Sequence, residues 1–391
     1  MDETPAETPA ETPAQLRARF AEFLDTHDPG PAPRHAGERL AWQRSWAAML
    51  VEAGFAAPGW PRAWGGMDLS LAHQVAYTEE LSRRRLPPHP SGGTFVVGPT
   101  LIVHGTPEQR ERYLRPALRG DEIWCQGFSE PDAGSDLPSL RTRARRDGDQ
   151  YVVTGRKIWI TNARAADRMF ALVRTGTQEQ RQAGISYLLI DMHAPGVTVV
   201  PLADMTGNTS FCEVTLDEVR VPISDRVGEE GGGWRIARTS LGHERSTAFI
   251  AQASKYRRVL DELVGLAVRL DRAGDPVVRQ ALARAETDLQ VVRLGGLRVL
   301  GELLRGREPG PAASLGRLVF TEFEQRLHAL AVEITGRAAV LAPGRAHPVE
   351  GGRWSAGLLA TRASTIGAGT AEIQRNTIAE QVLGLPREPA A

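Results

Sequence analysis

The sequence contains only two lysines, Lys157 and Lys255, among its 47 basic residues. We interpret this scarcity as a result of genome composition and not of function. The chain also has only two cysteines, Cys125 and Cys212, which excludes a disulfide framework and is typical of a reducing compartment. No apolar run approaches the roughly 18 residues of a membrane-spanning helix, and the acidic, proline-rich N-terminus lacks the pattern of a signal peptide. We therefore expect a soluble cytoplasmic protein without a membrane segment.

An excess of charge of either sign is also missing, because 47 acidic residues balance the 47 basic ones. A nucleic-acid-binding protein normally carries a basic excess, so the composition argues against that class. Motifs of several enzyme classes are absent as well. His243-Glu244 lacks the second histidine of a zinc-protease helix, and no Gly-x-Ser-x-Gly elbow, phosphate-binding loop or Gly-x-Gly-x-x-Gly after a strand occurs. We predict no metal site.

The length of 391 residues exceeds one ordinary core, so two or three domains are expected. Residues 3–14 repeat Glu-Thr-Pro-Ala three times, which leaves no apolar face to bury and predicts a disordered tail over residues 1–14. Residues 15–120 have apolar side chains at helical spacing, and Thr106-Pro107 predicts a helix start with threonine as the cap. This part is predicted to be an N-terminal helical domain.

From residue 121 to residue 230 the apolar period changes to two, and Asp147-Gly148 predicts a hairpin. Further β-rich runs lie at 168–173, 184–191, 197–200 and 211–222. This middle part is predicted to be a small antiparallel barrel or sandwich. Residues 231–391 return to helical spacing in four long segments that suit an antiparallel four-helix bundle. The predicted fold class is α+β, with a helical domain, a central antiparallel β-domain and a C-terminal four-helix bundle.

One stretch, from Cys125 to Asp136, joins a short apolar strand to a turn at Pro131 and a run of small polar residues. It reads Cys-Gln-Gly-Phe-Ser-Glu-Pro-Asp-Ala-Gly-Ser-Asp. Small residues let a backbone approach a ligand closely, so the strand end offers hydroxyls and amides to something flat and polar. An ordinary strand-to-loop turn is the alternative.

Two later stretches offer complementary groups. In the segment 155–162, Trp159 and Thr161 could supply a ring and a hydroxyl to a planar heterocycle, although a core tryptophan with a capping threonine is the alternative. In the segment 365–386, two glycines precede Thr370, which is a plausible helix cap. The unpaired N–H groups of such a helix start suit a carbonyl oxygen or a phosphate.

These stretches, in this order, resemble the acyl-CoA dehydrogenase family of flavoproteins over about residues 15 to 387. Ser-Glu-Pro-x-Ala-Gly-Ser-Asp at 129–136 and Gly-Thr-x-Glu-Ile-Gln-Arg-Asn at 369–376 carry the resemblance. It implies the α+β fold predicted above, FAD between the β-domain and the bundle, and α,β-dehydrogenation of an acyl-CoA or acyl-carrier-protein thioester. It also implies electron-transfer flavoprotein or a similar acceptor as a partner, and a homo- or hetero-oligomer.

The resemblance assigns site residues position by position. The cofactor contacts are Gln126, Phe128, Ser129, Ser135, Trp159, Thr161, Thr370 and Glu372. Ser129 stands where the family has a threonine near flavin N5, and it keeps the hydroxyl. The substrate contacts are Ser135, Ala368 and Arg245.

The reaction of this family needs a carboxylate that removes the α proton of the thioester. Much of the family places a glutamate immediately before the Gly-Thr pair, where this chain has Ala368. Other members place it on the first long helix of the bundle, and Glu244 matches that position. The spacing of Ala237, Leu241, Glu244 and Ala248 puts these residues on one helical face. A lone carboxylate on such a face is costly unless it is paired or functional. Glu244 is therefore the predicted base, and a structural glutamate paired with Arg245 or another arginine is the alternative.

Two features of the family are missing. The Arg-x-x-Phe-Gly segment is absent from residues 275–294, and Gly336-Arg337-Ala338-Ala339 stands near the usual Gly-Gly-x-Gly loop. Both segments contact FAD across a subunit interface in the family; Arg279 and Arg284 could replace them at the phosphates. A non-catalytic or half-site subunit of a hetero-oligomer, and a flavin oxidase or monooxygenase, are therefore kept as alternative functions.

Overall fold

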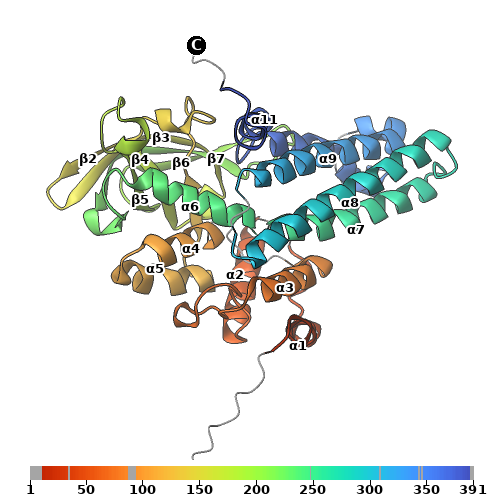
Figure 1. The fold of residues 1–391 in the computed structure, drawn as a ribbon, viewed down its shortest axis with the longest axis horizontal. Helices are drawn as coiled ribbons and strands as arrows, with labels where there is room; N and C mark the ends of the chain where they lie inside the picture. The colour runs from red at the N-terminus through yellow and green to blue at the C-terminus, as the bar shows by residue number, and fades with distance from the viewer. Residues whose placement is uncertain are drawn as a thin grey trace, which may run out of the picture.

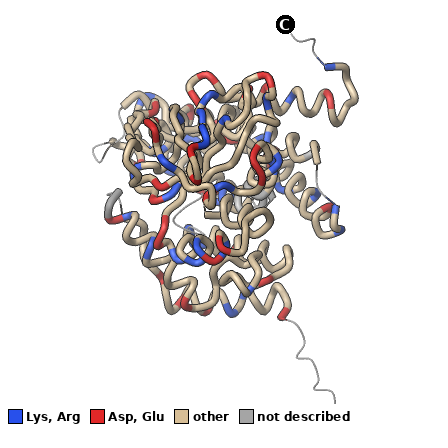
Figure 2. The backbone as a smooth tube through the Cα atoms, turned by 90° about the vertical axis from the view of Figure 1, so that its left-hand side faces the viewer, with Lys and Arg blue, Asp and Glu red and all other residues tan. Residues whose placement is uncertain are grey.

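The computed structural model describes residues 11–33, 36–86, 94–246, 248–307, 310–341, 344 and 347–387, without the side chains of 36–37, 243–246, 248–251 and 312. Figure 1 shows a helical domain at the bottom, a β-domain at the upper left and long helices extending to the right. The predicted three-part α+β architecture is confirmed. In Figure 2, basic and acidic residues are interspersed along the chain, in keeping with the zero net charge.

Five helices form the N-terminal domain: α1 (Pro13–Thr26), α2 (Ala36–Glu52), α3 (Leu71–Arg83), α4 (Thr94–His104) and α5 (Pro107–Arg119). Helix α5 begins at Pro107 with Thr106 as the cap, as predicted. Helix α1 begins at Pro13, inside the segment predicted to be a disordered tail, because Thr12 and Gln15 form a capping box. Residues 1–10 of that tail lie outside the described residues.

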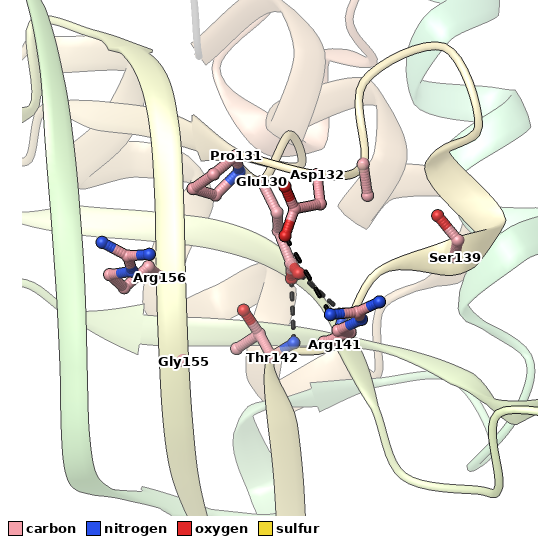
Figure 3. Close-up of a pocket in the computed structure, with 9 residues that line it drawn as sticks. Glu130, Pro131, Asp132, Ser139, Arg141, Thr142, Gly155 and Arg156 are labelled. Atoms are coloured by element: carbon pink, nitrogen blue, oxygen red, sulfur yellow. Dashed lines mark hydrogen bonds and ion pairs between the residues drawn. The ribbon is translucent and has the colours of Figure 1, made fainter.

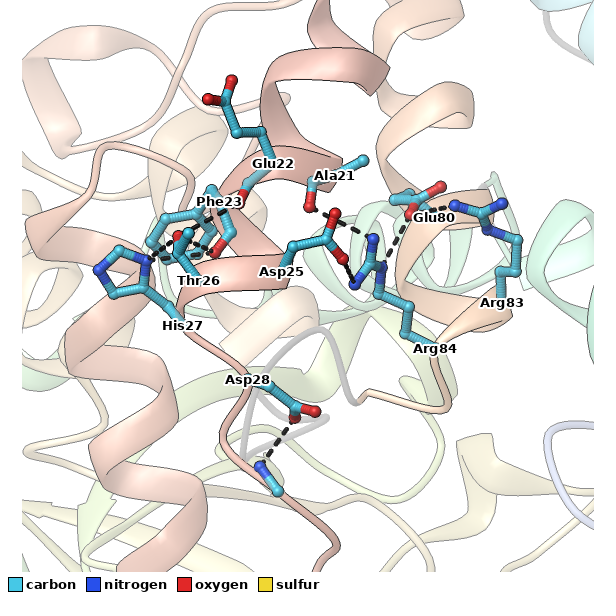
Figure 4. Close-up of polar contacts among 11 residues, drawn as sticks. Ala21, Glu22, Phe23, Asp25, Thr26, His27, Asp28, Glu80, Arg83 and Arg84 are labelled. Atoms are coloured by element: carbon cyan, nitrogen blue, oxygen red, sulfur yellow. Dashed lines mark hydrogen bonds and ion pairs between the residues drawn. The ribbon is translucent and has the colours of Figure 1, made fainter.

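An arginine at the end of the third helix joins it to the first (Figure 4). The Arg84 guanidinium donates to Asp25 at 2.6 Å and to Glu80 at 2.9 Å. Arg83 donates to the same oxygen of Glu80 at 2.7 Å. Burial favours a raised pKa for Glu80, but the two arginines outweigh burial and hold its pKa below the usual value. The ion pairs thus fix α1 against the end of α3.

The β-domain is one eight-stranded sheet. Its strands are β1 (Trp124–Gly127), β2 (Arg143–Asp147), β3 (Gln150–Thr161), β4 (Arg168–Arg174), β5 (Ile185–Asp191), β6 (Val197–Leu202), β7 (Phe211–Pro222) and β8 (Arg226–Val227). The order is β6-β7-β3-β2-β4-β5-β8, and β1 pairs with β4. Pairing is mostly antiparallel, as predicted, but β1 runs parallel to β4, and β2 meets β4 in a single parallel pair.

The predicted hairpin joins β2 to β3, with its turn one residue later than the Asp-Gly signal indicated. Asp147 pairs with Gln150, so Gly148 and Asp149 form the turn. Gly148 has a φ of 65°, which a side chain would disfavour.

The C-terminal part contains α6 (Gly233–Ser246), α7 (Ala248–Arg269), α8 (Pro276–Leu304), α9 (Ala312–Thr335), α10 (Arg353–Ala360) and α11 (Ala371–Thr377). Helices α7, α8 and α9 pack on one another, and α10 packs on α9, so these four form the bundle. Helix α6, at the start of the predicted bundle segment, also packs on α4 and β5. Every helix in the described ranges is too short or too polar to cross a lipid bilayer.

Three hydrophobic cores hold the fold together. The first is shared by the N-terminal helices, one face of the sheet and α6, and it includes Trp46, Phe170, Tyr187 and Ile236. The second lies within the β-domain, and the third lies within the bundle around Tyr256. Helix α6 therefore shares a core with the helical and β-domains.

Gly233 sets how closely α6 approaches the sheet. A Cβ at this position would lie 2.5 Å from the carbonyl carbon of Ser186 on β5. We expect Gly233→Ala to lower the free energy of unfolding by about 1–3 kcal/mol, because helix or strand must shift. Gly242→Ala on the same helix is the control, since a Cβ there meets nothing within 4 Å. It is expected to raise the free energy by about 0.5–1 kcal/mol. Urea denaturation measures both, and equal effects would contradict the prediction.

Candidate active site

The end of strand β3 presents an exposed aromatic ring. Lys157 pairs with Val214 and Ile160 with Cys212, so β3 carries one more residue than β7 between these pairs and forms a bulge. Trp159 lies in this bulge with a φ of 61°, a conformation that is disfavoured for a large side chain. Its side chain is 58% exposed and packs edge-on against Phe211, with the ring centroids 5.9 Å apart. The alternative of a core tryptophan is therefore excluded.

The end of β1 lies beside this bulge. The N–H of Ile158 donates to the carbonyl of Ser129 at 3.0 Å, which brings the β1 exit next to Trp159. Gln126 and Ser129 are half-buried, and Thr161 is exposed at the end of β3. The structure thus brings together the assigned positions on β1 and β3.

The Phe128 side chain is buried in the first core. Its ring lies edge-on to Phe170 and Tyr187, with centroid distances of 5.7 Å and 6.0 Å. Its buried side chain leaves the backbone of Phe128 for the cofactor contact assigned from the sequence, and that contact stays a prediction.

A buried ion pair lies beneath the β1 exit. The fully buried Nζ of Lys157 donates to Oε1 of Glu130 at 2.8 Å, to the carbonyl of Phe128 at 3.2 Å and to the carbonyl of Leu172 at 2.6 Å. This pair was not predicted from the sequence, because the scarcity of lysine was interpreted as genome composition. The sequence does contain one indication of the pair: a lysine stands two residues before Trp159, in a chain whose basic residues are otherwise almost all arginine.

The Glu130 carboxylate closes the loop that follows (Figure 3). It accepts the N–H groups of Arg141 at 2.7 Å and of Thr142 at 2.9 Å, next to a cavity of about 160 Å³. Burial favours a raised pKa for Glu130, but Lys157 and these amides outweigh burial, so its pKa lies below the usual value. Burial lowers the pKa of Lys157, and Glu130 offsets part of that effect. Glu130 is therefore ionised near neutral pH.

A second buried cation holds the outer part of this loop. The Arg174 guanidinium donates to the carbonyls of Pro138 at 2.6 Å, Leu140 at 3.3 Å and Thr177 at 3.3 Å. Asp136 accepts from Arg181 at 2.6 Å. The loop that exposes Ser135 is thereby tied to the loop between β4 and β5.

The Gly-Thr turn precedes α11. Thr370 caps this helix as predicted, because its hydroxyl accepts the N–H of Ile373 at 3.2 Å. Ala368 before it has a φ of 51° and is exposed, and the Glu372 carboxylate is exposed as well. In the part of the chain that the structure describes, no hydrogen bond or ion pair joins Thr370 or Glu372 to the β-domain. Their assignment to the cofactor stays a prediction.

The predicted base lies on α6. The side chains of Glu244 and Arg245 are outside the described residues, so both assignments stay predictions. One turn earlier, the hydroxyl of buried Ser240 lies 2.8 Å from that of Thr100. Other residues of α6 match the predicted faces: Ala237 is buried, Leu241 is half-buried, and Arg235 and Arg238 are exposed. The helix that carries position 244 is thus fixed to the helical domain.

The arrangement on β1 and β3 fits a flavin. An exposed indole ring, a hydroxyl at Thr161 and backbone polar groups at 126–129 offer stacking and hydrogen bonds to a flat heteroaromatic ring. A Cβ at Gly134 would meet nothing within 4 Å, so the loop leaves open space beside it.

Family models match the chain in three consecutive segments. They are the acyl-CoA dehydrogenase N-terminal domain at residues 10–121, the middle domain at 125–219 and the C-terminal domain at 231–383. The chain belongs to the acyl-CoA dehydrogenase family, and the resemblance found in the sequence is confirmed. It is an oxidoreductase of the acyl-CoA dehydrogenase class, whose members are flavoproteins.

Individual relatives cover almost the whole chain. Acyl-CoA dehydrogenase IpdE1 of Mycobacterium tuberculosis is 41% identical over 390 residues, which are 99% of this chain and 98% of that protein. The solved structure of the Tcur3481-Tcur3483 steroid ACAD has a TM-score of 0.83 at 31% identity, covering 99% of this chain and 100% of that one. The ChsE4-ChsE5 complex from Mycobacterium tuberculosis has a TM-score of 0.79 at 30% identity, with the same coverage.

Proposed function

We propose that this protein is an FAD-dependent dehydrogenase that forms a double bond between the α and β carbons of an acyl-CoA or acyl-carrier-protein thioester. The observation that carries the proposal is the exposed ring of Trp159, held on a strained bulge beside the β1 exit. The positions that would hold FAD are Gln126, the Phe128 backbone, Ser129, Ser135, Trp159, Thr161, Thr370 and Glu372.

The chemistry divides between the cofactor and the chain. Bound FAD would supply the acceptor for the hydride that leaves the β carbon. The Glu244 carboxylate takes the α proton, and the electron pair left behind forms the new double bond. The N–H of Ala368 donates to the thioester oxygen, where negative charge develops as the α proton leaves. Ser135 and Arg245 complete the proposed contacts with the thioester substrate.

A second, related chain completes the proposed assembly. Each of the two solved relatives is named as a pair of chains, Tcur3481-Tcur3483 and ChsE4-ChsE5, and this chain lacks the Arg-x-x-Phe-Gly segment that contacts FAD across the interface in the family. Helix α8 exposes the apolar residues Val291, Leu294, Leu297 and Leu304, which supports an interface there. The name of one relative adds steroid-like acyl groups to the proposed substrates. Electron-transfer flavoprotein or a similar protein is the proposed acceptor.

Purification followed by an anaerobic thioester screen tests this function. Yellow protein whose flavin is bleached by an acyl-CoA, with polycyclic and straight-chain acyl groups in the panel, is the expected result. Colourless protein that binds FAD only with a second chain would identify a half-site subunit. Rapid reoxidation of the reduced flavin by oxygen would identify an oxidase or monooxygenase. Bound flavin that no thioester reduces would contradict the proposal.

A further inference from the structure

We propose that Lys157 and Glu130 act as a positioning pair, which clamps the loop 128–142 shut and fixes the Phe128 carbonyl and Ser129 at the flavin edge. The role of the loop in binding FAD rests on the proposed function. The hydrogen bonds of Lys157 and Glu130 that hold the loop do not depend on that proposal. The two side chains are 27 positions apart in the sequence.

The ion pair connects both ends of the loop. At its start, the Lys157 ammonium donates to the Phe128 carbonyl, one residue before Ser129. At its end, the Glu130 carboxylate accepts the N–H groups of Arg141 and Thr142. The third N–H of the ammonium donates a hydrogen bond to the carbonyl of Leu172 on β4. One pair thus joins the β1 exit, the approach to β2, and strands β3 and β4.

Lysine suits this position better than arginine does. An ammonium has three donors around one point, and Lys157 uses them on three acceptors, two in the loop 128–142 and one on β4. A planar guanidinium would need a larger space and a different arrangement of acceptors. With 45 arginines in the chain (47 basic residues less two lysines), the presence of lysine here indicates a requirement of the site.

The clamped loop end also packs against strand β3. A Cβ at Gly155 would lie 2.6 Å from Cα of Thr142, so only glycine allows this approach. A buried ion pair often contributes less to stability than apolar residues of the same volume would. Backbone groups of a cofactor loop, however, must be held in one place, and buried polar groups can provide that specificity.

A charge-neutral double variant separates positioning from stability. Lys157→Met together with Glu130→Gln removes both charges and nearly keeps the side-chain volumes, so the FAD-free protein is expected to remain folded. Its dissociation constant for FAD is expected to rise about tenfold or more, because the Phe128 carbonyl has lost its donor. The FAD constant is measured by the recovery of flavin fluorescence, and the flavin absorption spectrum is recorded alongside. Lys255→Met, which replaces the exposed second lysine on α7, is the control.

An unchanged FAD constant and an unchanged flavin spectrum in the double variant would overturn the positioning role. If wild type and Lys255→Met also fail to bind FAD, the proposed function fails, and the clamp is tested by amine labelling instead. Lys157 is expected to react with an acetylating reagent about 100-fold more slowly than Lys255, because its amine is reached only when the loop opens. Glu130→Gln should accelerate labelling at Lys157 alone. Equal labelling of the two lysines in wild type would overturn the clamp.

Discussion

Glu244→Gln is expected to slow the reduction of the bound flavin by an acyl-CoA thioester about 100-fold or more. The amide keeps the size of the side chain but cannot accept the α proton. Single-turnover mixing under anaerobic conditions measures this step directly, because it separates flavin reduction from product release. Binding of FAD should be unchanged in the variant.

Two companion variants make this test specific. Glu229→Gln changes an exposed carboxylate shortly before α6 and should reduce its flavin at the wild-type rate. Adding Ala368→Glu to Glu244→Gln returns a carboxylate at the other position that the family uses. Position 368 already has a φ of 51° with alanine, so glutamate adds no new backbone strain. Near-normal reduction in Glu244→Gln would refute the assignment, and a rescue by Ala368→Glu would support it.

Glu130→Gln should lower the free energy of unfolding by about 3–5 kcal/mol at neutral pH, because it leaves the buried Lys157 without its counter-charge. Urea denaturation of the FAD-free protein gives this difference. Glu213→Gln is the control, since Glu213 pairs with Arg156 at 3.6 Å on the surface. Surface pairs contribute at most about 1 kcal/mol. Similar losses in both variants would contradict the special role of Glu130.

The difference in the free energy of unfolding between wild type and Glu130→Gln is expected to depend on pH. The folded protein holds the pKa of Glu130 below its ordinary value of 4.5. The unfolded chain therefore binds a proton first as pH falls, and the stabilisation is complete only above that ordinary value. The difference between wild type and Glu130→Gln should shrink as pH falls below 4.5 towards the folded pKa. A difference that stays constant over this range would show that the carboxylate charge is not what stabilises the loop.

Local signals in the sequence predicted most of the elements. Thr106 and Thr370 cap helices because a hydroxyl one position before a helix finds free N–H groups within three residues. Strands β2, β3 and β7 followed from the period of two and the hairpin signal, whereas β4 and β5, which are buried on both faces, were predicted from their β-rich composition. The Ser-Glu-Pro and Gly-Thr segments named the family, and the family models bear this out.

Long-range packing decided what the sequence did not reveal. The parallel pairing of β1 with β4 and the docking of α6 on β5 depend on surfaces that meet only in the folded protein. The exposure of Trp159 depends on a β-bulge that the neighbouring residues in the sequence do not predict. Lys157 and Glu130 are far apart in the chain, and their hydrogen bonds lead mainly to backbone groups that carry no sequence signal.

The first core has a consequence for recombination between relatives. It includes Ile236 and Ala237 of α6 together with residues of the N-terminal helices and the sheet, whereas the third core is confined to the bundle. A chimera that exchanges residues 231–383 as a block would replace α6 without the partners shaped to fit it. A crossover on the C-terminal side of position 244 keeps the shared core intact and exchanges the rest of the bundle. The helix that carries the proposed base would then be inherited with the flavin loop, and the proposed α8 interface would change independently of both.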